Sequence, residues 1–254
     1  MKRFLTVFSV VSMVGLFLAC TGGVRANLII VIPNYTFQTP DVPNDGVTDN
    51  RVDLDAVPDW TFTSSENGII AAGVWDPVNA DYGGSNGDNA ALPGTAQGGQ
   101  AAYVYLEQFN DLDPQPLGGI LTSNTALVTI EPLTRYDLTV AIGNAKSFNP
   151  GEVTIQEILV DGEVVASEFT DESTLPNNTF TDVTTSFTTT IDDPLIGGQL
   201  RIRLIHTHAG TGIREVEFDN IRLMTTTVPE PTSAALTLLC AAAMTARRRR
   251  EPAI

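Results

Sequence analysis

The chain has 254 residues, with 14 Lys plus Arg, 30 Asp plus Glu and a formal net charge of −16. Residues 27–226 hold 7 of the basic and 28 of the acidic residues, so this segment carries a formal charge of −21. Such a charge repels nucleic-acid phosphates and anionic lipid surfaces, which argues against both as partners. Both cysteines, Cys20 and Cys240, lie outside this segment, which excludes disulfides, cysteine catalysis and cysteine-type zinc sites within it.

The first residues have the pattern of a signal peptide. A positively charged start precedes an apolar run from Phe4 to Ala19, and Val24-Arg25-Ala26 offers the small residues that a signal peptidase reads. We therefore predict a signal peptide over residues 1–26. An alternative uses Cys20 as a lipid-attachment cysteine, although Phe17 stands where that motif prefers leucine.

Residues 27–226 have the pattern of an all-β domain. Short runs of alternating or β-branched residues recur between turn signals, and no long 3.6-residue apolar period predicts a substantial helix. Asp161-Gly162 predicts a two-residue hairpin, because both positions must tolerate positive φ. Many short strands must each hide one face against a second sheet, so we predict an antiparallel β-sandwich. The predicted strands are Leu28–Ile32, Ala101–Glu107, Ala126–Ile130, Tyr136–Ile142, Val153–Val160, Glu163–Glu168, Asp182–Thr190, Gln199–Thr207 and Ile213–Met224.

Long irregular segments are predicted at Thr39–Asp59 and Tyr82–Gln100. Loops on a rigid sandwich usually carry the binding residues, and a flat aromatic ring stacks on the apolar face of a sugar. Trp75 and Tyr82 lie beside or within the second loop, so we predict them as ligand-binding residues, whereas Trp60 and Tyr103 are assigned to the core.

Two histidines near the end of a predicted strand share one face. His206 and His208 are two residues apart, in phase with the apolar positions Leu200, Ile202 and Leu204. No third metal ligand is evident in the sequence. We therefore favour a non-ligand role at the strand end over a metal pair.

The last 28 residues combine three features in a fixed order. Val228-Pro229-Glu230-Pro231 is followed by an apolar run from Ala234 to Ala246 and then by Arg247, Arg248, Arg249 and Arg250. The prolines end any preceding regular structure, and the arginines favour a cytoplasmic position for the far end of the run. A run of 13 residues is shorter than the roughly 20 that span a bilayer core, so a transient insertion is predicted.

This arrangement resembles the PEP-CTERM sorting tail of Gram-negative bacteria. The resemblance implies that residues 227–254 are a sorting signal whose motif consists of Pro229, Glu230, Pro231 and Arg247 to Arg250. It also implies recognition by an exosortase, a membrane protease, and delivery to the cell surface or its exopolysaccharide. With the signal peptide, it predicts an exported protein that is attached to the inner membrane only transiently.

Five segments within residues 28–224 resemble the jelly-roll domains of exported PEP-CTERM proteins, which are similar to galactose-binding-like and carbohydrate-binding-module sandwiches. These segments are Asn34–Pro40, Val57–Thr61, Ala102–Leu106, Tyr136–Asn144 and Val216–Leu223. In that group, residues of the first and last strands often surround a structural calcium ion. The resemblance therefore implies four candidate calcium ligands: Asn34, Gln38, Asp219 and Asn220. Gln38 stands where an acidic residue is common in the group. The alternative is that Asp219 and Asn220 bond only to nearby backbone.

Three hypotheses about function follow. The first is a non-catalytic, carbohydrate-binding protein at the cell surface or in exopolysaccharide, and the second is a structural or adhesive matrix component without a defined small ligand. The third is a polysaccharide-active enzyme, which needs two carboxylates roughly 5–9.5 Å apart. The sequence lacks a Gly-x-Ser-x-Gly elbow, a His-Glu-x-x-His motif and a phosphate loop, so it favours the non-catalytic hypotheses.

Overall fold

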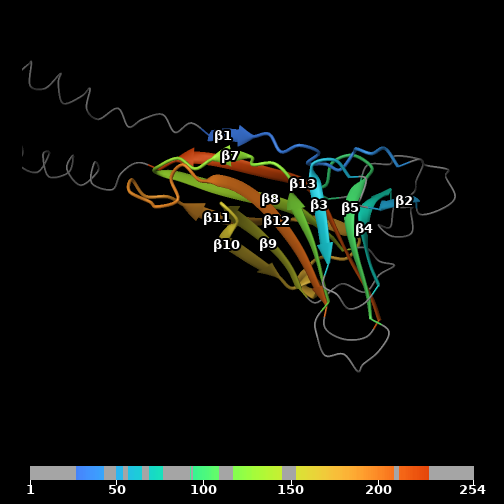
Figure 1. Ribbon diagram of the computed structural model, residues 1–254. Coiled ribbons are helices and arrows are strands. Elements are labelled where there is room, and N and C mark those ends of the chain that lie inside the picture. The colour runs from blue at the N-terminus through green and yellow to red at the C-terminus, as the bar shows by residue number, and fades with distance from the viewer. Residues whose placement is uncertain are drawn as a thin grey trace, which may run out of the picture. The chain divides into compact units, whose positions relative to one another are not determined.

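The described part of the chain folds into two antiparallel β-sheets (Figure 1). The computed structural model describes residues 27–42, 50–53, 57–64, 69–76, 92, 94–108, 117–144, 153–208 and 212–228. Strand and helix bounds in chain order are β1 (Asn27–Ile30), β2 (Asn50–Asp53), β3 (Trp60–Ser64), β4 (Ile69–Asp76), β5 (Ala101–Gln108), β6 (Leu117–Ser123), β7 (Val128–Thr129), β8 (Thr134–Asn144), β9 (Val153–Val160), β10 (Glu163–Thr170), the 3-10 helix η2 (Glu172–Thr174), β11 (Thr179–Thr188), β12 (Gln199–His208) and β13 (Gly212–Thr227).

The seven-stranded sheet has the order β11-β8-β13-β5-β4-β2, with β1 also paired to β13. The six-stranded sheet has the order β10-β9-β12-β6-β3, with β7 also paired to β12. Residues Leu28–Thr225 form one compact unit of the chain. The predicted all-β sandwich is thus confirmed, and η2 is the one helical element among the described residues.

The hydrophobic core lies between the two sheets. On β8 every second side chain from Tyr136 to Ile142 enters it, and on β12 Leu200, Ile202 and Leu204 do the same. This alternation is what a strand with one face on a core requires. Full burial of one such aliphatic side chain contributes about 1.5–3 kcal/mol. Trp60 belongs to this core, as predicted, and its ring centroid lies 5.4 Å from that of Phe37.

The alternation on β13 changes at Asn220. Val216 and Phe218 lie in the core, but so do Ile221 and Leu223, which means that the inward positions move from even to odd numbers. Asn220 lies between the two series with a φ of 44°, in the left-handed region that asparagine tolerates better than most residues. Before this irregularity, the odd-numbered side chains of β13 point to the face opposite the core.

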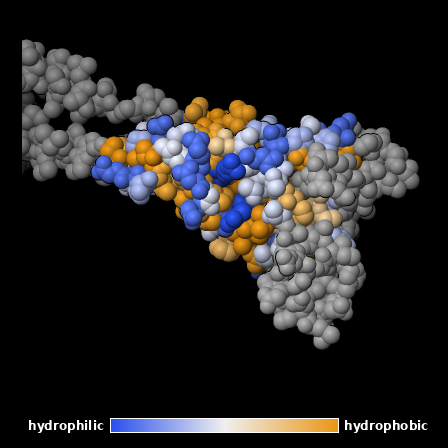
Figure 2. Space-filling model, viewed as in Figure 1, coloured by the Kyte–Doolittle hydropathy of each residue, from blue (hydrophilic) through white to orange (hydrophobic). Residues whose placement is uncertain are grey.

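Apolar side chains are exposed around β1. Leu28, Ile29 and Val31 are 60%, 70% and 81% exposed, and hydrophobic surface gathers at this strand in the space-filling view (Figure 2). These three side chains lie outside the core, whereas Ile32, the last residue of the predicted strand Leu28–Ile32, belongs to it.

The predicted strands all overlap observed ones, but β2, β3, β4 and β6 were not predicted. β2 lies inside the segment that was predicted to be irregular. β6 contains Gly118 and Gly119, which weaken a strand pattern. Gly119 is needed there, because a Cβ would lie 2.4 Å from Cγ1 of Val104 on the facing sheet.

The predicted hairpin is confirmed between β9 and β10, where Asp161 has φ 50° and Gly162 has φ 91°. Replacing Gly162 by alanine should cost about 1–2 kcal/mol, because an L-residue is strained in the left-handed region. No heavy atom lies within 4 Å of the added Cβ, so backbone strain alone should produce the loss. Urea unfolding of the variant measures it.

Gly118→Ala is the matched control, since Gly118 has no positive φ and its added Cβ would meet nothing closer than 4.0 Å. This variant should be as stable as the wild type or slightly more stable. Equal stability of the two variants would contradict the strain argument.

Candidate functional site

Two glutamates are buried on the face of the seven-stranded sheet that points away from the core. Glu215 and Glu217 of β13 are 2% and 0% exposed, although their neighbours Val216 and Phe218 are the inward residues. Glutamate is almost never fully buried in soluble proteins unless it is paired. Two buried carboxyl groups on the outward face of a sheet therefore mark a candidate functional site.

Aromatic side chains lie beside these glutamates on the neighbouring strand. The register between β13 and β5 places Glu217 opposite Tyr103 and Glu215 opposite Tyr105. Directly opposed residues on one face of an antiparallel pair have Cβ atoms about 4.5–5.5 Å apart. Each carboxyl group thus has a tyrosine as its cross-strand neighbour.

Trp75 of β4 completes the aromatic part of the site. It is fully buried and packs against Tyr103, with Ala71 and Tyr105 at the border of this small cluster. Gly73 of β4 is paired with Tyr103 of β5 and lies between Ala71 and Trp75 along its own strand. We call Trp75, Tyr103, Tyr105, Glu215 and Glu217 the outward site.

The predicted ligand-binding residues have different outcomes. Trp75 lies in the outward site, but its ring is buried and does not form an exposed platform. Tyr82 lies outside the described residues, as do Pro229, Glu230, Pro231 and Arg247 to Arg250. Tyr103 was assigned to the core; it is buried, but in the separate cluster with Trp75.

Asp219 continues the row of outward carboxyl groups towards the segment of residues 94–100. Burial raises its pKa to about 7, although hydrogen bonds from the backbone N–H groups of Gln97 and Asn220 and the charge of Arg222 oppose this rise. Arg222 is itself 2.5 Å from a carboxylate oxygen of Asp182. A carboxyl group with this pKa changes its charge near neutral pH.

Three of the four predicted calcium ligands bond to the backbone of residues 94–100. Gln38 donates a hydrogen bond to the backbone oxygen of Gln100 (3.1 Å), and Asn220 donates one to that of Thr95 (2.6 Å). Asp219 accepts one from the backbone of Gln97. Asn34 instead closes its own turn, with both side-chain atoms bonded to the backbone of Thr39.

Two oxygen atoms in this group have no hydrogen-bond partner among the described residues. Oδ1 of Asp219 and Oδ1 of Asn220 are buried and accept no hydrogen bond from any residue that the structure describes. Both are oxygen donors of the kind that calcium prefers. Across the described ranges, no group of three or more His, Cys, Asp or Glu side chains could hold a metal ion. The residues present therefore fit an ion only if amide and backbone oxygens contribute.

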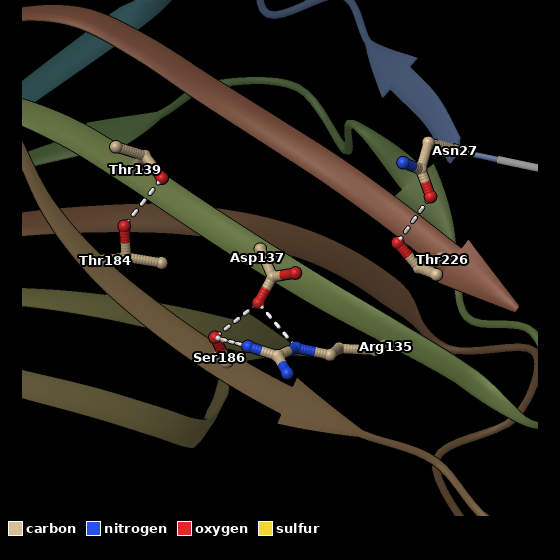
Figure 3. A network of polar contacts seen from close by, with 7 residues as sticks. All are labelled: Asn27, Arg135, Asp137, Thr139, Thr184, Ser186 and Thr226. Carbon is tan, nitrogen blue, oxygen red and sulfur yellow. Dashed lines mark hydrogen bonds and ion pairs between the residues drawn. The ribbon is translucent and has the colours of Figure 1, made fainter. Parts of the chain in front are cut away.

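A different part of the same face is exposed and polar (Figure 3). Arg135 donates a hydrogen bond to Asp137 (2.8 Å) and another to Ser186 (3.2 Å), and the hydroxyl groups of Thr139 and Thr184 are 2.8 Å apart. These residues on β8 and β11 make the ordinary outward surface of a sandwich sheet. The outward site on β4, β5 and β13 differs from this surface because its side chains are buried.

Sequence reasoning missed Glu215, Glu217, Tyr103 and Tyr105 as site residues. The available signal was the alternation Glu215-Val216-Glu217-Phe218-Asp219, in which acidic residues occupy every second position. The same pattern is typical of a strand with one solvated face, so burial of the acidic face could not be read from it.

The raised pKa of Asp219 predicts how stability depends on pH in the presence of a chelator. The carboxyl group ionises near pH 3.8 in the unfolded chain but near 7 in the folded protein. Between these values the unfolded state releases the proton and the folded state retains it, so the free energy of unfolding falls as pH rises. Asp219→Asn should remove this loss, giving a flatter curve in urea unfolding between pH 4 and 7.

Asp192→Asn serves as the control, because Asp192 is exposed in a turn. Its stability should follow that of the wild type at every pH. Parallel curves for Asp219→Asn and the wild type would show that the Asp219 carboxyl does not titrate differently in the folded state.

The fold is shared with cyclases of known structure. A Stig cyclase, Fisc, from Fischerella sp. TAU, solved in complex with (3Z)-3-(1-methyl-2-pyrrolidinylidene)-3H-indole, is 24% identical, with a TM-score of 0.58 over 80% of this chain and 100% of that one. A cyclase from the same organism in complex with 4-(1H-indol-3-yl)butan-2-one is also 24% identical, with a TM-score of 0.58 over 80% of this chain and 99% of that one. At 24% sequence identity, this structural similarity establishes a shared fold only. A search of curated protein sequences gives no significant match.

A family model corrects the identification made from the sequence. The model described as HpiC1 cyclase, of the HpiC1-like family, matches residues 29–224. The identification as a PEP-CTERM protein with a carbohydrate-binding-like domain is wrong, because the domain that it assigned to residues 27–226 matches a cyclase family.

The other corrections follow from this one. The non-catalytic, carbohydrate-binding or matrix role is wrong because the family is one of cyclases, and so is the expectation that the chain is not an enzyme. The predicted exosortase, signal peptidase and polysaccharide partners are wrong, as is the predicted location at the cell surface or in exopolysaccharide with inner-membrane attachment. In the described ranges, no helix has the length and apolar character to cross a membrane. With 196 of its residues inside the family model, the chain belongs to the HpiC1-like cyclase family.

Proposed function

We propose that this protein is an enzyme that cyclises a small molecule containing an indole or similar aromatic ring, and that the reaction takes place at the outward site. The observation that carries the proposal is the burial of Glu215 and Glu217 beside Tyr103, Tyr105 and Trp75, in a chain of a cyclase family. The two Fischerella cyclases, each in complex with an indole compound, support the choice of ligand class.

Glu217 is the proposed proton donor. It is fully buried, lies opposite Tyr103, and has Gly73 as the next residue across the sheet. Removal from water disfavours the charged form of a carboxyl group, and a protonated carboxyl can deliver its proton to a bound substrate. When the cyclised product loses a proton, the carboxylate accepts it, so the reaction is an isomerisation with no net change of mass.

Glu215 and the aromatic residues have supporting roles in this proposal. Glu215 is two residues from Glu217 on the same face, which separates their Cα atoms by about 7 Å. The faces of Trp75 and Tyr103 attract positive charge by cation–π interaction, worth about 0.5–2 kcal/mol. They are suited to stabilise the cation that forms when an unsaturated substrate is protonated.

Replacing Glu217 by glutamine tests the proton donor. Glutamine has nearly the same shape but cannot supply an acidic proton, so turnover should fall roughly 10²- to 10⁴-fold. The substrate is sought in a panel of indole compounds related to the two Fischerella ligands, with chromatography and mass spectrometry to detect a product of unchanged mass. Binding of 4-(1H-indol-3-yl)butan-2-one, measured by calorimetry, should be retained by Glu217→Gln and weakened by Tyr103→Ala.

Glu163→Gln is the matched control, because Glu163 is exposed at the start of β10. It should leave both turnover and binding unchanged. Full turnover by Glu217→Gln would assign the proton transfer to another group, and absence of both binding and product in the wild type would contradict the proposed function.

We further propose that Asp219 and Asn220 bind a calcium ion. Their two buried oxygens, which have no hydrogen-bond partner among the described residues, support this proposal, and the Gln38 side chain donates to the backbone of Gln100 at the end of the segment of residues 94–100. Asn34 is then a turn residue, since Thr39 engages both ends of its amide. The ion would supply a positive charge that keeps Asp219 ionised and would hold residues 94–100 against β13.

Calcium should raise the melting temperature of the protein relative to excess chelator. An ion at 100 times its dissociation constant stabilises the folded state by about 2.7 kcal/mol. Asp219→Asn should lose most of this gain in differential scanning fluorimetry, whereas Asp192→Asn should keep it. Identical melting of the wild type in calcium and in chelator would contradict the calcium site.

We also propose a jelly-roll arrangement and the domain bounds 27–226. Along the described strands the chain changes sheets between β2 and β3, β3 and β4, β5 and β6, β7 and β8, β8 and β9, β10 and β11, β11 and β12, and β12 and β13, which supports the jelly-roll arrangement. The compact unit Leu28–Thr225 and the family match over residues 29–224 support the bounds. The signal peptide over residues 1–26 and the separate apolar tail over residues 227–254 stay predictions, which mass spectrometry of the purified protein tests directly.

A further inference from the structure

A second group of buried polar side chains lies inside the sandwich, apart from the outward site. His206 on β12 follows the inward series of Leu200, Ile202 and Leu204 and is fully buried. The register places Thr154 of β9 opposite His206, and Thr154 is also fully buried. Glu172 of η2, 1% exposed, reaches into the same place.

A chain of hydrogen bonds connects these three residues. Nδ1 of His206 lies 3.0 Å from Oε1 of Glu172, and the hydroxyl of Thr154 donates to the same oxygen. Asp171 caps η2 by accepting a hydrogen bond from the backbone of Ser173, which fixes the turn that carries Glu172. A carboxylate oxygen accepts, so Nδ1 of His206 is the donor to Glu172; in the imidazole tautomer with its proton on Nδ1, Nε2 carries a lone pair.

Nε2 of His206 and a nearby amide have no partner within the described part of the chain. Nε2 of His206 is buried and makes no hydrogen bond to any residue that the structure describes, and the same is true of both polar atoms of the Gln156 side chain. Gln156 is 1% exposed, shares the inward face of β9 with Thr154, and is paired with Leu204. A buried polar group without a partner costs about 1–3 kcal/mol.

His206 and Gln156 are diagonal neighbours across the β9–β12 ladder. Such residues have Cα atoms roughly 7–8 Å apart, which is a distance that two long side chains and one small molecule can bridge. The bridging molecule must donate a hydrogen bond to Nε2 of His206 and must also bond to an amide, which both donates and accepts. It must be uncharged and small, because the surrounding inward side chains of β12 are aliphatic.

We propose that the sandwich interior contains a specific binding site for water, in which one ordered molecule donates a hydrogen bond to Nε2 of His206 and makes a second to the amide of Gln156. Buried waters of this type typically make about three hydrogen bonds to otherwise unsatisfied groups. The water extends the series Thr154, Glu172 and His206 to Gln156, so that β9, η2 and β12 are connected through one polar network. It also fixes the tautomer of His206 from both sides of the ring.

The experiment is carried out on the full chain with a crystal structure at high resolution and with NMR of ¹⁵N-histidine. We expect electron density for one water within hydrogen-bond distance of Nε2 of His206 and of Gln156. We also expect the ¹⁵N shifts of His206 to report a protonated Nδ1 and an unprotonated Nε2. Density for a metal ion at this place, an empty space between the two side chains, or a protonated Nε2 would each overturn the proposal.

A variant pair tests the role of the amide. Gln156→Leu removes both amide atoms, so the water should lose occupancy and the Nε2 resonance of His206 should shift. Gln199→Leu is the matched control, because Gln199 lies at the exposed start of β12, and it should leave the His206 resonances unchanged. An unchanged water in a crystal structure of Gln156→Leu would overturn the assignment of Gln156 as a partner. Where Gln156→Leu does not fold, the wild-type density and tautomer decide the proposal.

Discussion

Burial of both faces of β4, β5 and β13 is the constraint on which the rest of the structure depends. A strand in a sandwich normally buries one face and leaves the other to water. Here the inward face packs Val104, Leu106 and Phe218 into the core, and the outward face carries the buried groups Trp75, Tyr103 and Glu217. Each of the three strands therefore separates an apolar layer from a polar and aromatic one.

The irregularity at Asn220 sets where the outward row of carboxyl groups ends. From Glu215 to Asp219 the outward positions of β13 are acidic, and the next outward residue after Asn220 is Arg222, which pairs with Asp182 on β11. The positive charge of Arg222 acts on Asp219, whose pKa is still raised by burial. The change of phase on a single strand thus places a cation beside the last member of an acidic row without removing any core residue.

The sequence was sufficient for the fold class because period-two alternation and turn chemistry are local properties. The hairpin at Asp161-Gly162 and the inward series of β8 and β12 follow from them directly. The outward site was not predictable in this way, because an acidic residue at every second position has the same pattern whether that face is solvated or covered. β6 was missed for a related reason: Gly119 is explained only by its closeness to Val104 on the other sheet.

The alternation on β13 also bears on how this family can diversify. Val216 and Phe218 hold the two sheets together, while the intervening Glu215 and Glu217 point to the opposite side and take no part in that packing. Substitutions at the glutamates can therefore alter chemistry with little effect on the core, and substitutions at the apolar positions can adjust stability with little effect on chemistry. A strand built in this way lets selection act on reactivity and on folding as nearly independent traits.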